Sequence, residues 1–398
     1  MTGGGALPEG FLFGASTAAH QIEGNNTTSD WWALEQRPGG FLPEPSGDAA
    51  DSFHRWPEDM DLLAGLGFNA YRFSIEWARI EPARGRYSWA ALAHYRAMVE
   101  GALARGLTPV VTLHHFTLPQ WFAEAGGWLA PDAAELFARY AATAAAEVLD
   151  GVRYVATINE PNVLARMHTL MGMLAEGPAG VDLDRVDPGE DITEALVRAH
   201  RAAAAALREA DSRLLVGWTV GGLGLYPVEP GAEATAAAVS RRREGVFVEA
   251  ARGDDWLGVQ AYTRTPVGVD GPVPVAEGVR TTIKGWEYYP QALGETVRGM
   301  AALVGPDVPL LVTENGIATA DDTERIAYTT EALAGLADAL RDGVDVRGYL
   351  HWSLLDNYEW GSYRPTFGLV AVDPRTFERS PKPSAHWLGA LAREGRLG

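Results

Sequence analysis

Two glutamates stand at the ends of apolar runs that are typical of buried strands. Glu314 follows the apolar part of "PLLVTENG" (309–316), and Glu160 follows that of "YVATINEP" (154–161). A buried ionised carboxylate is costly unless it is paired or meets a ligand. Two carboxyls facing each other across one site are what glycoside hydrolysis requires, because one acts as the acid and the other as the nucleophile. A separation of ~5 to 5.5 Å would indicate retention of configuration, and ~6.5 to 9.5 Å inversion.

Polar and aromatic residues lie within or just after the other apolar runs as well. Indole and phenol rings stack on sugar rings, and amide, imidazole and carboxyl groups hydrogen-bond hydroxyl groups in fixed directions. The set therefore favours a sugar as the ligand. Its members are His20, Gln21, Glu23, Arg72, Glu76, His114, His115, Asn159, Tyr262, Trp352, Glu359 and Trp360.

The same residues allow less specific interpretations. A lone glutamate at a strand end is more often a helix cap or a salt-bridge partner, and lone histidines are more often structural. His114, His115 and Glu160 could instead hold a metal, as in barrel hydrolases that use zinc. The sequence has neither an H-x-H nor an H-E-x-x-H spacing, so we predict no metal site and no cofactor.

The elements that must position these residues alternate along the chain. Continuous apolar runs suit parallel strands buried on both faces, and helical periodicity fills the stretches between them, for example 90–106, 130–149 and 329–343. We predict a single (β/α)8 TIM barrel with inserted loops at the C-terminal face of the strands. A doubly wound open sheet is the alternative, but no Gly-rich nucleotide turn follows the first run. The eight runs are 11–17, 70–77, 107–116, 154–161, 213–220, 256–263, 309–316 and 346–356.

Composition limits the partners. The chain has 398 residues, a net charge of −19 and no cysteine, which argues against a nucleic-acid partner and excludes disulfides. No apolar run reaches the ~18 residues that a membrane span needs. We expect one catalytic domain over 1–398, a cytoplasmic location, no membrane partner, and a monomer or small homo-oligomer that binds a small-molecule β-glycoside.

Taken together, the motifs resemble glycoside hydrolase family 1, the β-glucosidase family. They occur in the family's order and extend over nearly the whole chain. The segments are "FLFGASTAAHQIEG", "YRFSIEWARIEP", "TLHHFTLPQW", "TINEP", "GWEYYP", "TENG", "HWSLLDNYEW" and "SPKPSAHW".

The resemblance implies a retaining reaction and assigns its central residues. Glu314 would be the nucleophile that forms a covalent glycosyl-enzyme, and Glu160 the acid that then acts as a base on water. Neighbouring donors would hold Glu314 ionised, while burial and the charge of Glu314 raise the pKa of Glu160. Arg72 and Tyr262 correspond to the donors to the nucleophile, and Asn159 to the residue that binds the sugar 2-hydroxyl.

The resemblance also implies the substrate-binding residues. Gln21, His115, Glu359 and Trp360 match positions that bind the hydroxyls of the nonreducing-end sugar, and Trp352 matches the ring beneath that sugar. Trp286 matches a platform for the leaving group, and Phe367 is assigned to the substrate-binding set. A cis peptide bond is expected after Trp352. The carboxylate of Glu359 would repel a phosphate, so an unphosphorylated sugar is expected.

Several positions depart from the family's pattern. Phe116 and Thr117 stand where Trp and Asp are common, Gln260 and Ala261 replace the usual Asn and a common Tyr, and Thr366 stands where Arg is common. "VGWTV" lacks an Asn that is frequent on the fifth strand. The connections over 221–255 and 264–308 are expected to be shortened, which would open the leaving-group side of the site.

We therefore predict a β-glucosidase-like O-glycosyl hydrolase, a retaining exo-β-glycosidase. Its substrates would be unphosphorylated β-D-glucosides, with β-galactosides and β-fucosides as further candidates. A transglycosylase that uses the same intermediate is the near alternative. A non-catalytic sugar-binding barrel would predict loss of Glu160 or Glu314, and both are present.

Overall fold

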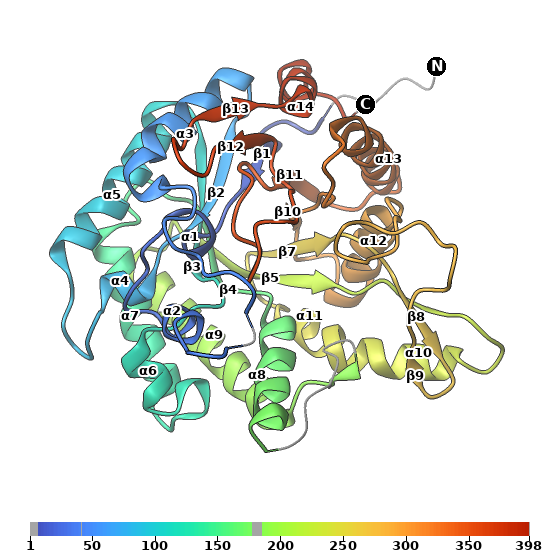
Figure 1. Ribbon diagram of the computed structural model, residues 1–398, viewed down its shortest axis with the longest axis horizontal. Coiled ribbons are helices and arrows are strands. Elements are labelled where there is room, and N and C mark those ends of the chain that lie inside the picture. Colours follow the sequence, from blue (N-terminus) through green and yellow to red (C-terminus); the bar gives the residue numbers. More distant parts are fainter. Residues whose placement is uncertain (1–6, 41, 177–184, 398) are drawn as a thin grey trace.

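Eight parallel strands close into a barrel in the order β1-β11-β10-β7-β5-β4-β3-β2 (Figure 1). The computed structural model describes residues 7–40, 42–176 and 185–397. Each strand overlaps one of the eight apolar runs, so the predicted (β/α)8 barrel is confirmed and the doubly wound open sheet is wrong. The strands are β1 Leu12–Ser16, β2 Ala70–Ser74, β3 Thr108–His114, β4 Tyr154–Asn159, β5 Leu215–Gly222, β7 Trp256–Ala261, β10 Leu310–Glu314 and β11 Val346–Trp352.

Helices connect the strands and surround the barrel (Figure 1). In the first half of the chain they are α1 Ala19–Ile22, α2 Asp30–Glu35, α3 Ser52–Leu66, α4 Trp77–Ile80, α5 Trp89–Ala104, α6 Gln120–Glu124, the 3-10 helix η1 Gly127–Leu129, α7 Ala133–Glu147 and α8 Pro161–Glu176. They continue with α9 Glu190–Ala210, α10 Glu233–Ser240, the π-helix η3 Arg241–Gly245, α11 Val246–Ala250, α12 Ala292–Val304, α13 Asp322–Arg341 and α14 Pro383–Glu394.

The predicted helices lie where periodicity placed them, with one shifted start. The helices α5 and α7 correspond to the predictions over 90–106 and 130–149. The helix predicted over 329–343 begins earlier, at Asp322, because the Asp321 side chain caps it by accepting from the Thr323 backbone N–H. Gly343 follows the end of α13 with a φ of +88°, as a C-terminal glycine should.

The core has two layers. An inner cluster takes one apolar residue from each barrel strand, and a larger cluster lies between the strands and the helices. Successive side chains of a strand point to opposite faces, so Leu311 belongs to the inner cluster and Val312 to the outer one. These inner residues are Leu12, Ala70, Val110, Ala156, Leu215, Trp256, Leu311 and Leu350, and Tyr154 of β4 also packs against them.

Polar side chains replace this inner layer toward the C-terminal ends of the strands. Arg72 lies two residues beyond Ala70 on β2, and Thr112 lies two residues beyond Val110 on β3, so both share the inner face of their strands. Both are buried. The barrel interior therefore changes from apolar to polar where an active site is expected.

The connections after β5 and β7 carry additional elements that border the mouth of the barrel. The strands β6 Leu225–Pro227, β8 Thr265–Gly268 and β9 Gly271–Pro272 form a small separate sheet near α10 (Figure 1). After β11, strands β12 Val370–Val372 and β13 Arg379–Pro381 pair antiparallel. In the ranges that the structure describes, no helix is both long enough and apolar enough to cross a membrane.

Candidate active site

Glu314 is the last residue of β10, and its carboxylate accepts three hydrogen bonds. Arg72 Nη1 donates to Oε1 at 2.6 Å, Gln260 Nε2 donates to the same oxygen at 2.7 Å, and the Tyr262 hydroxyl donates to Oε2 at 2.5 Å. A register shift between β10 and β7 lies directly before Glu314, and such irregularities redirect side chains near active sites. The carboxylate is thus held by one cation and two neutral donors, which stabilise its charged form.

Asn159, at the end of β4, is fixed by three hydrogen bonds that its side-chain oxygen accepts. Its Oδ1 accepts from Arg72 Nη2 at 2.6 Å, Gln260 Nε2 at 2.8 Å and Thr219 Oγ1 at 2.9 Å. These donors fix which side of the amide carries oxygen. The amide nitrogen then lies 3.4 Å from His115 Nε2 and has a second hydrogen to donate.

Glu160 directly follows β4 in a strained backbone conformation. Its φ is +43°, a region that few residues other than glycine adopt and that is often found at functional sites. The Glu160 backbone N–H donates to the Thr219 carbonyl at 2.8 Å, and Pro161 then starts α8, where proline is favoured. On β5, a Cβ at Gly221 would lie 2.4 Å from Glu160 Oε1, so glycine leaves room for the carboxyl.

The two glutamates differ in their electrostatic surroundings. Burial, followed by the charge of Glu314, raises the pKa of Glu160 to about 8. Burial also raises the pKa of Glu314, while Arg72 and Tyr262 oppose that rise. No side chain in the described part of the chain donates a hydrogen bond to Glu160. A proton shared by the pair should therefore reside on Glu160.

Four rings form a parallel stack beside these carboxyls. His20 stacks on Trp360 with ring centroids 5.8 Å apart, Trp360 on His115 at 6.1 Å, and His115 on Trp352 at 5.9 Å. Phe116 packs edge-on against Trp360 at 5.2 Å. Phe116 therefore contributes an aromatic contact with Trp360, but it lacks the N–H donor that a tryptophan would have. The expected cis peptide between Trp352 and Ser353 is present.

Several buried polar atoms in this region have no hydrogen-bond partner among the residues that the structure describes, and Gln21 Oε1 and His115 Nδ1 are two of them. Gln21 Nε2 donates to Asn357 Oδ1 and to the Tyr358 carbonyl, both at 3.0 Å, so Oε1 is left as an acceptor. His115 Nε2 faces the Asn159 amide nitrogen, which makes Nδ1 the protonated nitrogen. One acceptor and one donor are therefore left for a polar ligand.

Glu359 adds a carboxyl to the same region. It is buried, and Trp352 Nε1 donates to its Oε1 at 3.1 Å. Burial raises the pKa of Glu359 to about 7, with the charge of Lys284 opposing the rise. The sequence analysis did not single out Lys284, although it is one of only two lysines in the chain.

Trp286, Phe367 and Tyr262 form an aromatic group on the other side. The Trp286 ring lies 5.7 Å from Tyr262 and 6.3 Å from Phe367, and all three belong to a cluster with Trp352. The structure therefore brings the predicted site residues together, through the contacts of Tyr262 with Glu314 and of Trp352 with His115 and Glu359.

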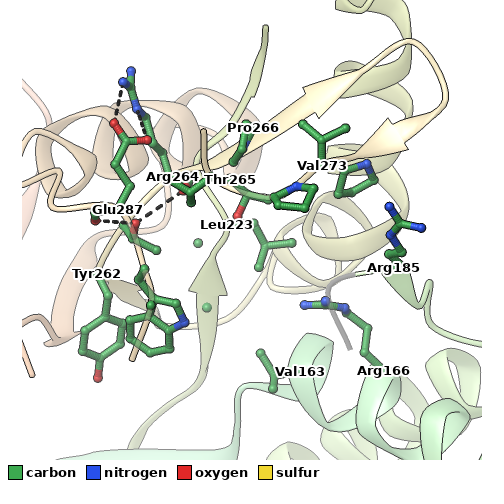
Figure 2. A pocket seen from close by; sticks show the side chains of 18 of the residues that line it. Val163, Arg166, Arg185, Leu223, Tyr262, Arg264, Thr265, Pro266, Val273 and Glu287 are labelled. Carbon is green, nitrogen blue, oxygen red and sulfur yellow. Dashed lines mark hydrogen bonds and ion pairs between the residues drawn. The ribbon is translucent and has the colours of Figure 1, made fainter. Parts of the chain in front are cut away.

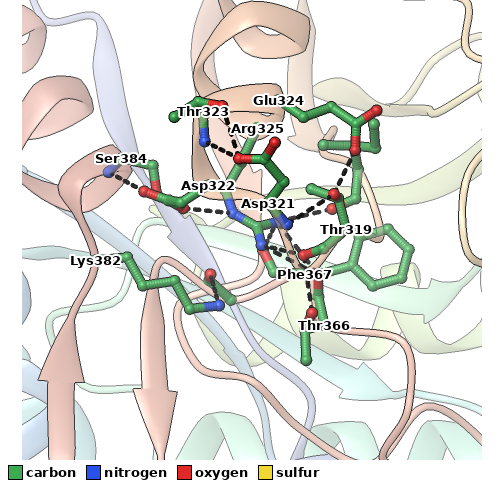
Figure 3. A network of polar contacts seen from close by, with 12 residues as sticks. Thr319, Asp321, Asp322, Thr323, Glu324, Arg325, Thr366, Phe367, Lys382 and Ser384 are labelled. Atoms are coloured by element: carbon green, nitrogen blue, oxygen red, sulfur yellow. Dashed lines mark hydrogen bonds and ion pairs between the residues drawn. The ribbon is translucent and has the colours of Figure 1, made fainter.

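The loop that carries Phe367 is held by a buried arginine (Figure 3). From α13, Arg325 Nη1 donates to the carbonyls of Ile317 at 2.8 Å and Phe367 at 3.2 Å, and Nη2 donates to that of Thr319 at 2.8 Å. Both nitrogens also donate to the Thr366 carbonyl. The side-chain hydroxyl of Thr366 donates to the Thr319 carbonyl at 2.9 Å. Thr366, a departure from the family's pattern, thus takes part in joining the loops after β10 and β11.

A cavity of about 460 Å³ opens beside Glu160 (Figure 2). Gln260, Tyr262 and Trp286 also line it. Much of the remaining wall is apolar and comes from α8 and from the connections after β5 and β7, including Val163, Leu223, Pro266, Val273 and Pro274. Glu314 and the stacked rings lie outside this lining, so the cavity extends from the Glu160 side of the site.

His114 and His115 point to opposite sides of the chain. His114 packs edge-on against Trp128 with centroids 5.0 Å apart, whereas His115 stacks on Trp352. Burial lowers the pKa of His114 to about 3. The metal alternative that groups both histidines with Glu160 does not fit this geometry. Within residues 7–40, 42–176 and 185–397, no cluster of three or more His, Cys, Asp or Glu side chains is arranged to hold a metal.

The other strand-end carboxyls have structural partners. Glu23 pairs with Arg79 at 2.8 Å. Glu76 caps α4 by accepting from the Ala78 backbone N–H at 3.2 Å, and it also accepts from the Thr117 hydroxyl at 2.8 Å. The common interpretation of a lone strand-end glutamate as a cap or a salt-bridge partner is correct for these two.

Sequence reasoning missed three residues that position the site. Thr112 accepts from Arg72 Nε at 3.1 Å, Thr219 donates to Asn159, and Gln260 joins Asn159 to Glu314. Gln260 was noted only as a departure from the family. All three are polar residues inside apolar strand runs, which is the signal that could have identified them.

Comparison with known proteins gives consistent results for most of the chain. The model of glycosyl hydrolase family 1 matches residues 4–254 and 263–396. The unmatched segment between them contains Gln260 and Tyr262. A β-glucosidase of Agrobacterium sp. is 34% identical over 97% of this chain and 95% of that protein. Thermostable β-glucosidase B of Thermobispora bispora is 32% identical over 98% and 92%, respectively.

Solved structures are similar over the same extent. The crystal structure of a β-glycosidase that is 46% identical superposes with a TM-score of 0.90 and covers 98% of this chain and 97% of its own. A Thermotoga maritima β-glucosidase in complex with deoxynojirimycin is 28% identical, with a TM-score of 0.88 and coverage of 99% and 100%.

Proposed function

Because the chain belongs to glycosyl hydrolase family 1, we propose that it is a retaining exo-β-glycosidase that hydrolyses unphosphorylated β-D-glucosides. The proposal extends to β-galactosides and β-fucosides, and it treats residues 1–398 as one catalytic domain. The observation that carries it is the asymmetry of the carboxyl pair. Glu314 accepts from Arg72, Gln260 and Tyr262, whereas burial and the charge of Glu314 raise the pKa of Glu160 to about 8.

The proposed reaction has two displacement steps. In the first, a Glu314 oxygen bonds to the anomeric carbon while the bond from that carbon to the leaving-group oxygen breaks. The leaving oxygen takes the proton of Glu160. In the second, Glu160 removes a proton from water, the water oxygen bonds to the anomeric carbon, and Glu314 is released. The reaction requires the two carboxyls to lie ~5 to 5.5 Å apart.

Asn159 is proposed to act on the sugar during both steps. Its Oδ1 is occupied by three donors, so its free amide hydrogen can bond the sugar 2-hydroxyl. A hydrogen bond that strengthens as the anomeric carbon becomes positive lowers the barrier, because it favours the transition state over the ground state.

The unpartnered atoms of Gln21 and His115 support binding of the nonreducing-end sugar. Gln21 Oε1 can accept from one hydroxyl, and His115 Nδ1 can donate to another. Glu359 adds an acceptor, and Trp352 adds an apolar ring face. A phosphate placed near Glu359 would meet its carboxylate, which favours an unphosphorylated sugar.

A panel of aryl β-glycosides with leaving groups of graded acidity tests the proposal. Glu314→Ala should lose turnover on every substrate. Glu160→Ala should lose ~100- to 10,000-fold on poor leaving groups and much less on good ones, which depart without a proton. Wild-type turnover in both variants would rule out the mechanism.

Further measurements on the wild type separate the alternatives. The first product observed by NMR should be the β-anomer, and net inversion would contradict a glycosyl-enzyme. A chelator should leave turnover unchanged, whereas a metal hydrolase would lose it. An added alcohol measures the share of transfer to an acceptor other than water and so tests the transglycosylase alternative.

A further inference from the structure

The cavity beside Glu160 has two kinds of wall. On one side lie the rings of Tyr262 and Trp286, next to the ion pair of Arg264 and Glu287. Figure 2 shows Arg166 and Arg185 on the opposite side, across the cavity from Tyr262. A cavity of about 460 Å³ is large enough for a leaving group of drug-like size.

The wall chemistry suits a leaving group that has an apolar part. Beside its polar and charged residues, the lining contains an apolar set of Val, Leu and Pro side chains. Val163, Leu223, Pro266 and Val273 are among the side chains that line the cavity (Figure 2). Together with the two aromatic rings, they favour a flat apolar leaving group.

The two sides of the cavity differ in their charged groups. Arg264 is matched by Glu287 in a two-point ion pair, with contacts of 2.8 and 3.1 Å, so this pair adds no net charge. Arg166 is buried, and its Nε donates to the Val186 carbonyl at 3.0 Å, which places its charge close enough to influence Glu160. In a chain with a net charge of −19, the side chain of Arg185 adds a positive charge to this wall.

Arg185 is the cavity arginine whose side chain is available to bind a ligand. It is exposed, lines the cavity, and makes no ion pair or hydrogen bond with any residue in the ranges that the structure describes. An arginine fork that is not otherwise engaged can bind a carboxylate through two parallel hydrogen bonds.

We propose that the cavity selects flat apolar leaving groups that carry a carboxylate, with Arg185 pairing with that carboxylate. The inference rests on the proposed glycosidase function, because it assigns the leaving group of that reaction. The rings of Tyr262 and Trp286 contact the apolar part of the leaving group, and its glycosidic oxygen lies toward Glu160.

The test compares two β-glucosides of matched reactivity. One has 3-(4-hydroxyphenyl)propanoate as its leaving group and the other has the primary amide of that acid. Two methylenes separate the carboxylate or amide from the phenol, so the two leaving groups have nearly equal acidity. At low ionic strength, the acid should be hydrolysed with a kcat/KM about three- to fivefold above that of the amide, and the preference should decline with added salt.

Two variants locate the effect. Arg185→Gln should remove the preference, so that kcat/KM for the acid falls to the value for the amide measured with the same variant. Arg201→Gln, on the exposed surface of α9, removes the same charge elsewhere and should keep the preference. Equal rates for acid and amide in the wild type would overturn the inference, as would a preference that persists in Arg185→Gln. Those outcomes leave the proposed function intact, whereas failure to hydrolyse either glucoside would contradict the proposed function itself.

Discussion

Gln260 is the residue whose role departs most from what its sequence position suggests. Its single amide nitrogen donates to Glu314 Oε1 and to Asn159 Oδ1, so it links the nucleophile to the residue assigned to the sugar 2-hydroxyl. A hydrogen bond to a charged acceptor contributes ~1.5 to 3 kcal/mol. Gln260→Leu should therefore lower kcat/KM ~10- to 100-fold.

The pH profile separates this positioning role from a general loss of structure. Without Gln260, the carboxylate form of Glu314 is less stabilised, so its pKa rises and the acidic limb of kcat/KM moves to higher pH. The basic limb, assigned to Glu160 with its pKa of about 8, should stay in place. Gln260→Asn keeps the amide on a shorter side chain, so its acidic limb should lie between those of the wild type and Gln260→Leu. An unchanged acidic limb in Gln260→Leu would show that the hydrogen bond does not affect ionisation.

The residues that could be predicted from the sequence are those that end strands. Glu160, Glu314, Asn159 and Trp352 interrupt apolar runs and stand out for that reason. Gln260 does not, because it lies within β7, where a polar residue looks like an exception in the core. Its contact with Glu314 depends on a register shift between β7 and β10, and no sequence pattern reports such a shift.

At the scale of elements, Arg325 joins α13 to the loops after β10 and β11. Arg325→Met would leave the carbonyls of Ile317, Thr319, Thr366 and Phe367 without this donor in a buried region. Unpaired buried polar groups each cost ~1 to 3 kcal/mol, so the free energy of unfolding should fall by about 3 kcal/mol or more. Urea denaturation measures this change.

A variant on the same helix serves as the control. Arg341 is exposed near the end of α13 and pairs only with Asp338 among the residues that the structure describes, so Arg341→Met should change stability by less than ~1 kcal/mol. Because Phe367 packs against Tyr262, Arg325→Met should also raise KM for aryl glycosides. Equal unfolding free energies in the two variants would refute the role assigned to Arg325.

The helices and strands with a strong hydrophobic periodicity were predicted correctly. The boundaries and short strands that depend on specific contacts were not. The eight strands follow from apolar runs, because a parallel barrel buries both faces of every strand. The early start of α13 depends on the Asp321 cap. The sheet of β6, β8 and β9 is built from strands of two to four residues, too short for an alternating pattern to be recognised.

At the scale of the whole molecule, closure of the barrel assembles the site. His20 and Trp360 lie near opposite ends of the chain, yet their rings stack because β1 pairs with β11. Given a barrel, the sequence motifs predict that these residues meet at the C-terminal ends of the strands. The place of Arg185 in the cavity wall could not be predicted, because Arg185 meets the connections after β5 and β7 only in the folded chain.

The barrel also buries carboxyls outside the site, and Glu76 makes stability depend on pH. Burial raises the pKa of Glu76 from 4.5 to about 8, with the charge of Glu23 adding to the rise and Thr117 and Arg79 opposing it. The folded state therefore holds a proton that the unfolded chain releases above about pH 4.5. This contribution to stability is complete below that pH and is lost as the pH rises toward 8.

Glu76→Gln tests this linkage, because glutamine cannot ionise. Between pH 5 and 8, the unfolding free energy of the variant relative to wild type should increase by up to ~1.4 kcal/mol per pH unit, and the difference should be constant below about pH 4. Glu194→Gln, on the exposed face of α9, removes the same charge at the surface and controls for the change in net charge. Chemical denaturation at several pH values measures both. Parallel stability curves for wild type and Glu76→Gln would mean that Glu76 ionises in the fold as readily as in the unfolded chain, because only a difference in proton binding gives the two curves different slopes.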